Sequence, residues 1–357
     1  MKFIVRVDAS RWIGSGHVMR CLVLADALKA VGHQVTFICR PQSGDLIDLI
    51  VERGHQLIIL PKLINSITPT SSADYAAWLQ VPWQQDAAEV LNCVIQADWL
   101  VVDHYGINSQ WELQIKQALN CKLLAIDDLV RPHAAELILD QTLGRTHDEY
   151  LKVQELKNSK PVILSGSIFA LLGSQFDRLR SESLRRTAPK DKVKILVTMG
   201  GIDQPNATLS VLKALVPKIN AHFTVLLSKR APHYSEVSEY CSKYTNVSHI
   251  EFTVDMATLM LNHHIGIGAP GSTSWERACL GLPSILIPLA DNQIDICRNL
   301  VDFKSAVKVE LADIGSSIVK QYHEILAHWD EYSSACLRVC DGQGTQRVLS
   351  EILRLSK

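Results

Sequence analysis

The 357-residue chain lacks several features that place proteins in common classes. Its formal net charge is −1, and no basic stripe runs along it, so we expect no nucleic-acid partner. It contains no run of about 18 apolar residues, so we expect no membrane span. The apolar start, Phe3 to Val7, is too short for a secretory signal and is followed by charge. These absences predict a cytoplasmic protein, which we expect to be a monomer.

The cysteines show no disulfide framework, because their number, nine, is odd and their spacing is irregular. They lie in apolar or helical segments, which is typical of reduced core thiols in a cytosolic protein. Cys336 and Cys340 form the only close pair, and no second pair completes a zinc site. We therefore expect no metal and no cofactor. His-Glu-x-x-His, Gly-x-x-x-x-Gly-Lys-Ser/Thr and Gly-x-Ser-x-Gly are also missing, which disfavours a zinc protease, a P-loop ATPase and a serine hydrolase.

What is present is an alternation of apolar strands with amphipathic helices in both halves of the chain. Strands that are apolar throughout indicate parallel sheets covered on both faces. The predicted strands are Phe3–Val7, Val35–Cys39, Leu57–Leu60, Trp99–Asp103 and Lys122–Ile126, then Val193–Thr198, Phe223–Leu227, Ile265–Ile267 and Ser284–Ile287.

The length predicts two domains, at about 100–200 residues each. Residues 1–175 and 190–335 each form a predicted doubly wound, Rossmann-like α/β domain, and residues 336–357 form a helical tail that can pack back on the first domain. Between the domains, a basic run from Arg178 to Lys192 predicts an exposed helix and a linker with solvated charges. We expect the domains to face each other and to hold a ligand in a cleft at the carboxyl ends of their strands.

The first candidate site is the loop from Asp8 to His17, between the first strand and the first helix. Gly14 and Gly16 allow a tight turn and close approach to a ligand, and a helix start attracts anions. His17 begins that helix, and its usual pKa of about 6.5 suits proton transfer. The alternative is a plain tight turn with a histidine at the helix start.

Two loops of the second half resemble the first loop in position. Gly200, Gly201 and Asp203 follow a strand and can cradle a diphosphate, with Asn206 placed to cap the next helix. After another strand, Ser272 and Thr273 offer hydroxyls and backbone donors. Either loop alone could be an ordinary turn, but the Asp8–His17 loop and the Gly200 loop occupy corresponding places in the two domains, which favours a bound nucleotide. Glu276 can accept bonds from ribose hydroxyls, or can simply be a first-turn carboxylate favoured by the helix dipole.

Other polar residues also end strands. Asn292 and Gln293 are placed to hold a sugar or a water, and Tyr105 in Asp103-His104-Tyr105-Gly106 can bond the sugar or the attacking water. The pair Asp127-Asp128 is equally compatible with a solvated turn and a site role. The pair His263-His264 has no metal-ligand spacing and is interpreted as structural.

Several of these stretches resemble a known family. Arg6-x-Asp8-Ala9-Ser10-x-x-Ile13-Gly14-x-Gly16-His17-x-x-Arg20-Cys21-Leu22 is similar to the start of the UDP-2,4-diacetamido-2,4,6-trideoxy-β-L-altropyranose hydrolases of the pseudaminic acid pathway. Similar stretches continue over nearly the whole chain: Val102–Gly106, Ile126–Asp128, Asp140-Gln141, Met199–Asp203, Asn292-Gln293 and Asp341-Gly342-x-Gly344. The chain departs at Ser165–Leu172, where the family has Gly-Pro-x-Tyr-Ala-Leu, and at Thr142, where asparagine is common.

The resemblance implies a two-domain GT-B fold and hydrolysis of a UDP-sugar with inversion at the anomeric carbon. It implies that His17 is the catalytic base and that Tyr105 and Asn292 line the sugar site. It also implies that UDP binds near Gly200, Gly201, Ser272, Thr273 and Glu276. With these we group the other predicted substrate-binding residues, Asp8, Gly14, Gly16, Arg20, Asp203 and Gln293.

Two other functions remain open. A glycosyltransferase on the same fold would use an acceptor hydroxyl in place of water. A non-catalytic regulator would bind the UDP-sugar without releasing UDP, although binding alone needs no histidine in the loop.

Overall fold

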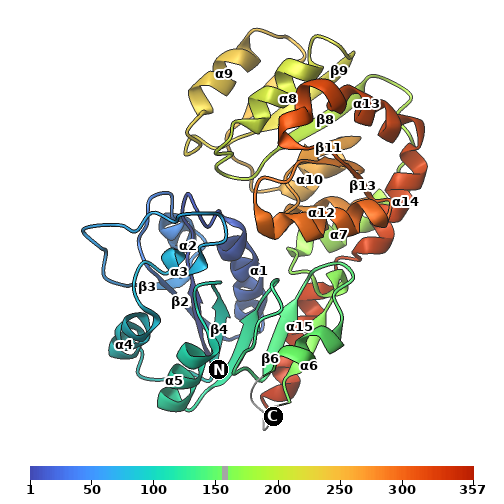
Figure 1. Cartoon of the computed structure of the whole chain (residues 1–357). Helices are drawn as coiled ribbons and strands as arrows, with labels where there is room; N and C mark the ends of the chain where they lie inside the picture. The colour runs from blue at the N-terminus through green and yellow to red at the C-terminus, as the bar shows by residue number, and fades with distance from the viewer. Residues whose placement is uncertain (155–159) are drawn as a thin grey trace. The chain divides into compact units, whose positions relative to one another are not determined.

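The computed structural model describes residues 1–154 and 160–357 and divides the chain into two compact units (Figure 1). The first unit comprises Met1–Leu171 and Gln343–Lys357, and the second comprises Leu172–Gly342. Each unit is built on a wholly parallel sheet, which confirms the predicted α/β class. In the described parts of the chain, no helix is both long enough and apolar enough to cross a bilayer.

The sheet of the first unit has seven strands in the order β3-β2-β1-β4-β5-β6-β7. The order reverses between β1 (Lys2–Val7) and β4 (Trp99–Asp103), which pair with Val7 opposite Asp103. In doubly wound sheets, ligands bind at the carboxyl ends of the strands beside such a switch point. The other strands are β2 (Gln34–Cys39), β3 (Gln56–Ile59), β5 (Lys122–Ile126), β6 (Leu137–Asp140) and β7 (Val162–Ser165).

Helices cover both faces of this sheet, which explains why its strands are apolar on both sides. The helices α1 (Gly16–Ala30), α2 (Ile47–Glu52) and α15 (Gly344–Leu355) bury their apolar residues in one core. On the opposite face, α4 (Trp83–Cys93) and α5 (Ser109–Leu119) bury theirs in a second core. The short helices α3 (Tyr75–Trp78), α6 (His147–Val153) and η1 (Ser167–Phe169) complete the unit.

The last helix of the chain, α15, packs against η1, and this close contact explains why Gly344 of the Asp341-Gly342-x-Gly344 motif is a glycine. A Cβ at Gly344 would lie 2.3 Å from the carbonyl oxygen of Ala170, so only glycine fits there. Arg347 of α15 donates to the carbonyl oxygen of Ile168 at 2.7 Å. The loop that departs from the family pattern is therefore held against α15 by close packing and by a hydrogen bond.

The sheet of the second unit has six strands in the order β10-β9-β8-β11-β12-β13, with its switch point between β8 and β11. Its strands are β8 (Val193–Thr198), β9 (Ala221–Leu226), β10 (Val247–Ile250), β11 (Ile265–Gly268), β12 (Ser284–Leu286) and β13 (Ala306–Lys308). Its helices are α7 (Ser174–Ser183), α8 (Ala207–Leu215), α9 (Tyr234–Ser242), α10 (Met256–Leu261), α11 (Thr273–Cys279), α12 (Ile294–Asp302), α13 (Ile314–Ala327) and α14 (Trp329–Val339), with η2 (Asp291–Gln293) and η3 (Leu311–Asp313).

The basic run from Arg178 to Lys192 does not form a uniformly solvated face, so that expectation is wrong in part. Arg180 of α7 donates to the carbonyl oxygens of Cys279, Leu337 and Cys340 at 2.6–2.7 Å. Arg186 donates to the carbonyl oxygens of Leu280 and His263 and lies over the ring of Trp329. The last carbonyls of a helix have no intrahelical partner, and these two guanidinium groups satisfy them.

Candidate functional site

His17 and Asp103 form a buried hydrogen-bonded pair at the switch point of the first sheet. His17 lies in the first turn of α1, and its Nδ1 is 2.6 Å from Oδ1 of Asp103, the last residue of β4. The His17 side chain is 9% exposed and that of Asp103 is fully buried. Because the carboxylate accepts at Nδ1, we assign the imidazole proton to that nitrogen and the lone pair to Nε2. Nε2 bonds no other described residue, so it can take a proton from a ligand or from water.

Arg20 keeps Asp103 ionised and oriented. Its Nε donates to Oδ2 of Asp103 at 2.6 Å, and Nη2 donates to Oδ1 at 2.8 Å, a two-point contact that fixes the carboxylate plane. Burial alone would raise the pKa of Asp103, but Arg20 and His17 outweigh it and hold that pKa well below its usual range. Nη1 bonds Asp128 at 2.7 Å. The guanidinium of Arg20, predicted to bind substrate, is thus already engaged by protein carboxylates.

Tyr105 meets His17 edge to face, with 4.7 Å between the ring centroids. Its hydroxyl donates to Oδ2 of Asp128 at 2.6 Å. Burial and the nearby Asp128 carboxylate raise the pKa of Tyr105 well above its usual value, so the phenol stays protonated at neutral pH. Because that proton points at Asp128, the phenolic oxygen can only accept a hydrogen bond from a ligand. The structure therefore brings the predicted His17 and Tyr105 together.

Two further aromatic rings, both from α3, surround this pair. Trp78 stacks on Tyr105 with 5.6 Å between centroids and meets His17 edge on at 6.3 Å. The ring centroid of Tyr75 lies 4.8 Å from that of Trp78 and 5.1 Å from that of Tyr105. Apolar rings exclude water and so strengthen the electrostatic interactions of the imidazole. The contacts of Tyr75 and Trp78 with Tyr105 are not predicted by the sequence, because α3 is a single helical turn without a periodic pattern of apolar residues.

The other predicted residues of the first loop have distinct local roles. Asp8 is 1% exposed, and its Oδ1 accepts from Nη1 of Arg6 at 2.6 Å and from the backbone nitrogen of Arg40 at 2.7 Å. Its carboxylate therefore organises the interior of the unit. Gly14 has a φ of +79°, which favours glycine, and Gly16 starts α1 without a capping side chain. The open helix start leaves backbone donors available to an anion.

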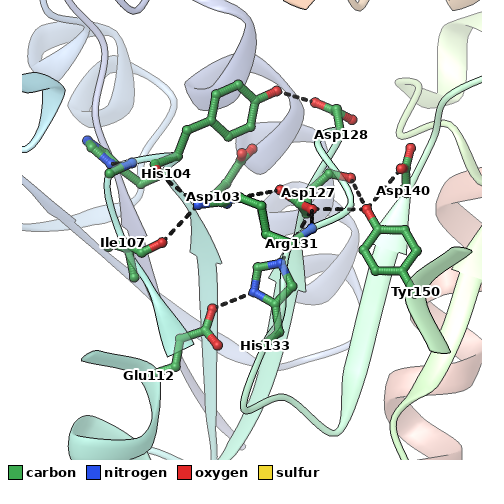
Figure 2. Close-up of polar contacts among 12 residues, drawn as sticks. Asp103, His104, Ile107, Glu112, Asp127, Asp128, Arg131, His133, Asp140 and Tyr150 are labelled. Atoms are coloured by element: carbon green, nitrogen blue, oxygen red, sulfur yellow. Dashed lines mark hydrogen bonds and ion pairs between the residues drawn. The ribbon is translucent and has the colours of Figure 1, made fainter. Parts of the chain in front are cut away.

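The adjacent residues Asp127 and Asp128 bind different partners. Asp127 is fully buried, so the interpretation as a solvated turn is wrong for that residue. Its carboxylate accepts from Arg131 and from the hydroxyl of Tyr150 (Figure 2). Asp128 instead turns to Arg20 and Tyr105 and becomes part of the candidate site.

In the second unit, the loop after β8 leaves open space around Gly200 and contains Asp203, which caps the next helix, α8. Gly200 has a φ of +90°, and a Cβ there would meet no atom within 4 Å. Gly201 follows it and is half-buried. The carboxylate of Asp203 accepts from the backbone nitrogens of Ala207 and Thr208 at 2.9 and 2.8 Å, so it caps α8.

The expectation that Asn206 caps α8 is wrong. Asn206 adopts the left-handed conformation, makes no capping bond, and donates from its side chain to Glu236 at 2.9 Å. Asp203 takes the capping role, because both of its carboxylate oxygens accept from backbone nitrogens of the first turn of α8.

The loop after β11 begins beside the end of β8. A Cβ at Gly268 would lie 2.2 Å from the carbonyl oxygen of Thr198, so the close approach of the two strand ends requires glycine. Ser272 and Thr273 follow and begin α11 without a capping side chain. The loops that carry Gly200 and Ser272 thus start from neighbouring strands at the second switch point.

Glu276 and Arg277 of α11 each leave a buried polar atom without a hydrogen-bond partner, Oε2 and Nε respectively. Burial raises the pKa of Glu276 to about 7, in spite of the neighbouring arginine. Burial likewise lowers the pKa of Arg277 to about 10. Nη2 of Arg277 donates to the carbonyl oxygen of Ala269 at 3.0 Å and to Ser274 Oγ at 3.1 Å. A cation thus supports the β11 loop from beneath with no carboxylate bonded to it in the described chain.

Asn292 and Gln293 lie in η2 of the second unit. Oε1 of Gln293 accepts from the backbone nitrogen of Leu289 at 2.8 Å, so this side chain orders its own loop. Asn292 is half-buried. Because it belongs to a different unit from His17 and Tyr105, its joint role with them stays a prediction.

Sequence reasoning placed Asp103 and Asp128 at strand ends, with a site role as one alternative for Asp128, but it did not pair them with His17 and Tyr105. Asp103 follows four apolar residues of β4, the neighbour of β1, and Asp128 follows β5. An acidic residue at the carboxyl end of an apolar strand was the available signal. The side chain that each carboxylate binds depends on the order of the strands in the sheet, and the sequence does not reveal that order.

The chain is similar to one protein-family model and to several known proteins. Residues 194–335 match the model of the glycosyltransferase family 28 C-terminal domain. The chain is 26% identical over 249 residues to the UDP-2,4-diacetamido-2,4,6-trideoxy-beta-L-altropyranose hydrolase of Campylobacter jejuni, which covers 69% of this chain and 77% of that protein. It is 25% identical over 303 residues to an uncharacterized protein of Methanocaldococcus jannaschii, covering 80% of this chain. The chain spans 55% of the length of that archaeal relative.

Among solved structures, MurG of Acinetobacter baumannii matches with a TM-score of 0.63 over 99% of both chains at 15% sequence identity. That likeness shows the two-domain fold. It confirms the predicted GT-B fold with two Rossmann-like α/β units. The chain therefore has the GT-B fold, carries a region that matches the glycosyltransferase family 28 C-terminal domain, and is similar to UDP-2,4-diacetamido-2,4,6-trideoxy-beta-L-altropyranose hydrolase.

Proposed function

We propose that the protein is an enzyme acting on nucleotide sugars and that it hydrolyses UDP-2,4-diacetamido-2,4,6-trideoxy-β-L-altropyranose. The products are UDP and free 2,4-diacetamido-2,4,6-trideoxy-L-altrose, as in cytoplasmic pseudaminic acid biosynthesis. The observation that carries the proposal is the His17–Asp103 pair, which fixes the proton on Nδ1 and leaves Nε2 available. The sugar identity rests on the similarity to the Campylobacter enzyme.

In the proposed step, Nε2 of His17 takes one proton of a water molecule as the water oxygen bonds the anomeric carbon. The bond from that carbon to the diphosphate oxygen breaks, and its electron pair leaves with UDP. Attack opposite the leaving group inverts the anomeric configuration. Asp103 stabilises the imidazolium that forms, and such general-base catalysis contributes about 10²–10⁴-fold. Tyr105 supplies an acceptor oxygen for the water or for a substrate hydroxyl or amide.

We assign the UDP part of the substrate to the second unit. Gly200, Gly201, Ser272 and Thr273 offer backbone and hydroxyl donors for the diphosphate. Glu276 is assigned to the ribose hydroxyls, since its unpartnered Oε2 is an acceptor that lacks a donor. Asn292 and Gln293 are assigned to the sugar, with Asn292 counted as catalytic beside His17 and Tyr105.

A glycosyltransferase is the second candidate, because residues 194–335 match the C-terminal domain of a glycosyltransferase family. In that case His17 would deprotonate an acceptor hydroxyl in place of water. A regulator without catalysis is less favoured, because binding a UDP-sugar requires no base held by a buried carboxylate.

The test is incubation of the purified protein with a panel of UDP-sugars and no acceptor, followed by NMR. Hydrolysis predicts rapid UDP release from the diacetamido-trideoxy sugar, with the inverted free sugar as the first product. Binding without UDP release would contradict the proposal and support a regulator. UDP release that appears only after a sugar or lipid acceptor is added would identify a transferase.

A further inference from the structure

Arg131 holds the turn that begins at Tyr105. Its Nη1 donates to the carbonyl oxygen of Tyr105 at 2.7 Å. It also donates to the carbonyl oxygen of Ile107 at 2.9 Å (Figure 2). Its guanidinium carbon also lies 5.4 Å from the centroid of the Tyr105 ring. One side chain thus fixes the turn that carries Tyr105 and also covers the ring itself.

Arg131 is in turn fixed by Asp127. Its Nε donates to Oδ1 of Asp127 at 2.8 Å, and its backbone nitrogen donates to Oδ2 at 2.9 Å. The hydroxyl of Tyr150 donates to the same carboxylate at 3.1 Å. Since Asp128, the next residue in the chain, accepts the phenolic proton of Tyr105, one short segment holds Tyr105 at both ends.

A second ion pair supports this anchor from the sheet side. Nδ1 of His133 lies 2.7 Å from Oε1 of Glu112, and Nε2 lies 3.5 Å from Oδ2 of Asp127. Burial would lower the pKa of His133, but Glu112 and Asp127 outweigh it and raise that pKa to about 9. The ring is therefore charged at neutral pH. Two cations, Arg131 and His133, thus face the buried carboxylates of Asp127 and Glu112, and these contacts fix the support in one arrangement.

We infer that Arg131 is a positioning residue that sets the Tyr105 oxygen relative to His17, an inference that rests on the proposed function. Arg131 contacts neither His17 nor the imidazole-bound carboxylate, so it acts through Tyr105. Displacement of a catalytic group by about 1 Å can cost about 100-fold in rate, so the loss of a two-carbonyl clamp acts on turnover and leaves UDP binding in place.

The kinetic test is a double-mutant cycle with Arg131→Lys, Tyr105→Phe and the double variant. Lysine keeps the charge but cannot reach Asp127 and two carbonyls with one planar group. We expect Arg131→Lys to lower kcat about 10- to 100-fold with little change in KM. The double variant should be no slower than Tyr105→Phe alone. Losses that multiply, or a kcat for Arg131→Lys near that of the wild type, would overturn the inference.

The matched control is Arg186→Lys in the second unit, because Arg186 also bonds two carbonyls and lies over an aromatic ring. It should lose thermal stability to a similar extent and keep kcat. A drop in kcat equal to that of Arg131→Lys would mean that loss of stability, and not positioning, explains both.

A readout without turnover separates this inference from the proposed function. In protein labelled with 3-fluorotyrosine, the Tyr105 resonance is identified by its loss in Tyr105→Phe. We expect that resonance to shift or split in Arg131→Lys and to stay in place in Arg186→Lys. An unchanged Tyr105 resonance in Arg131→Lys would overturn the inference even if the wild type proves to be a hydrolase. A shifted resonance with no UDP release by the wild type would instead overturn the hydrolase and leave the positioning intact.

Discussion

The two units place charged side chains beside the same kind of strand edge, yet the pKa values of these groups shift in opposite directions, because charged partners outweigh burial in the first unit and burial prevails in the second. In the first unit, Arg20 and His17 hold the pKa of Asp103 well below its usual range, and carboxylates raise that of Arg20. In the second unit, burial raises the pKa of Glu276 to about 7 and lowers that of Arg277 to about 10. Paired charges are organised before substrate arrives, whereas unpartnered buried groups cost stability until a ligand bonds them. The first edge is thus suited to chemistry and the second to binding.

The largest expected effect comes from breaking the organised pair of the first unit. His17→Ala should lower kcat by about 10²–10⁴-fold, because the general base is removed. Asp103→Asn should lower kcat at least about 10²-fold, because an amide can donate to Nδ1 and so stabilise the wrong tautomer. UDP affinity, measured by calorimetry, should stay near that of the wild type in both. Near wild-type turnover by either purified variant would contradict the assigned roles.

The next effect concerns Arg277, which supports the β11 loop of the second unit. Arg277→Met should raise the Kd for UDP about tenfold or more, because the loop that carries the proposed diphosphate donors loses hydrogen bonds to a charged group, each of which contributes about 1.5–3 kcal/mol. Calorimetric titration with UDP measures this directly. Arg298→Met, at an exposed arginine of α12, is the control and should leave the Kd unchanged. Equal Kd values for the two variants would show that Arg277 serves only the fold.

A pH series sharpens the comparison at Glu276. Its folded-state pKa of about 7 lies above its usual 4.5, so the stability it contributes is present below about pH 4.5 and is lost as the pH rises through 7. Glu276→Gln cannot ionise and should therefore melt higher than the wild type above pH 7, by about 2–4 °C for each kcal/mol recovered. The difference should vanish near pH 4.5. A constant difference across the series would mean that the carboxyl is not held protonated by burial.

The smallest effect distinguishes neighbouring arginines of the basic run. Arg186→Ala should lower Tm by several degrees, because it leaves two carbonyl groups unsatisfied at about 1–3 kcal/mol each. Arg185→Ala, one residue earlier and exposed, should change Tm by less than about 1 °C. Thermal melts of the two variants measure this, and equal losses would restore the interpretation of the run as a solvated face.

Much of the fold was predictable from the sequence, because long apolar strands and amphipathic helices carry their own signal. β1 and β4 lie within one residue of their expected bounds. β6, β7, β10 and β13 were not anticipated, since strands of three or four residues are too short to show a clear period. The basic run misled because the carbonyls that bind Arg180 and Arg186 come from distant segments.

The candidate site was predictable only at its most distinctive positions. His17 and Tyr105 are marked by a glycine-rich loop and a strand end, and the structure brings them into contact. The contacts of Asp103, Asp128 and Arg131 with these two side chains were not predictable, because they are set by the strand order of the sheet. Trp78 lies on a single helical turn, so its stacking on Tyr105 follows from tertiary packing alone.

The central claim is that water held by His17 attacks the anomeric carbon of the sugar. Its most direct test is turnover of the UDP-sugar in water enriched in oxygen-18, with the UDP product analysed by mass spectrometry. Attack at carbon predicts that the UDP carries no label and that the heavy oxygen enters the free sugar. UDP heavier by one oxygen-18 would show attack at phosphorus and would contradict the account.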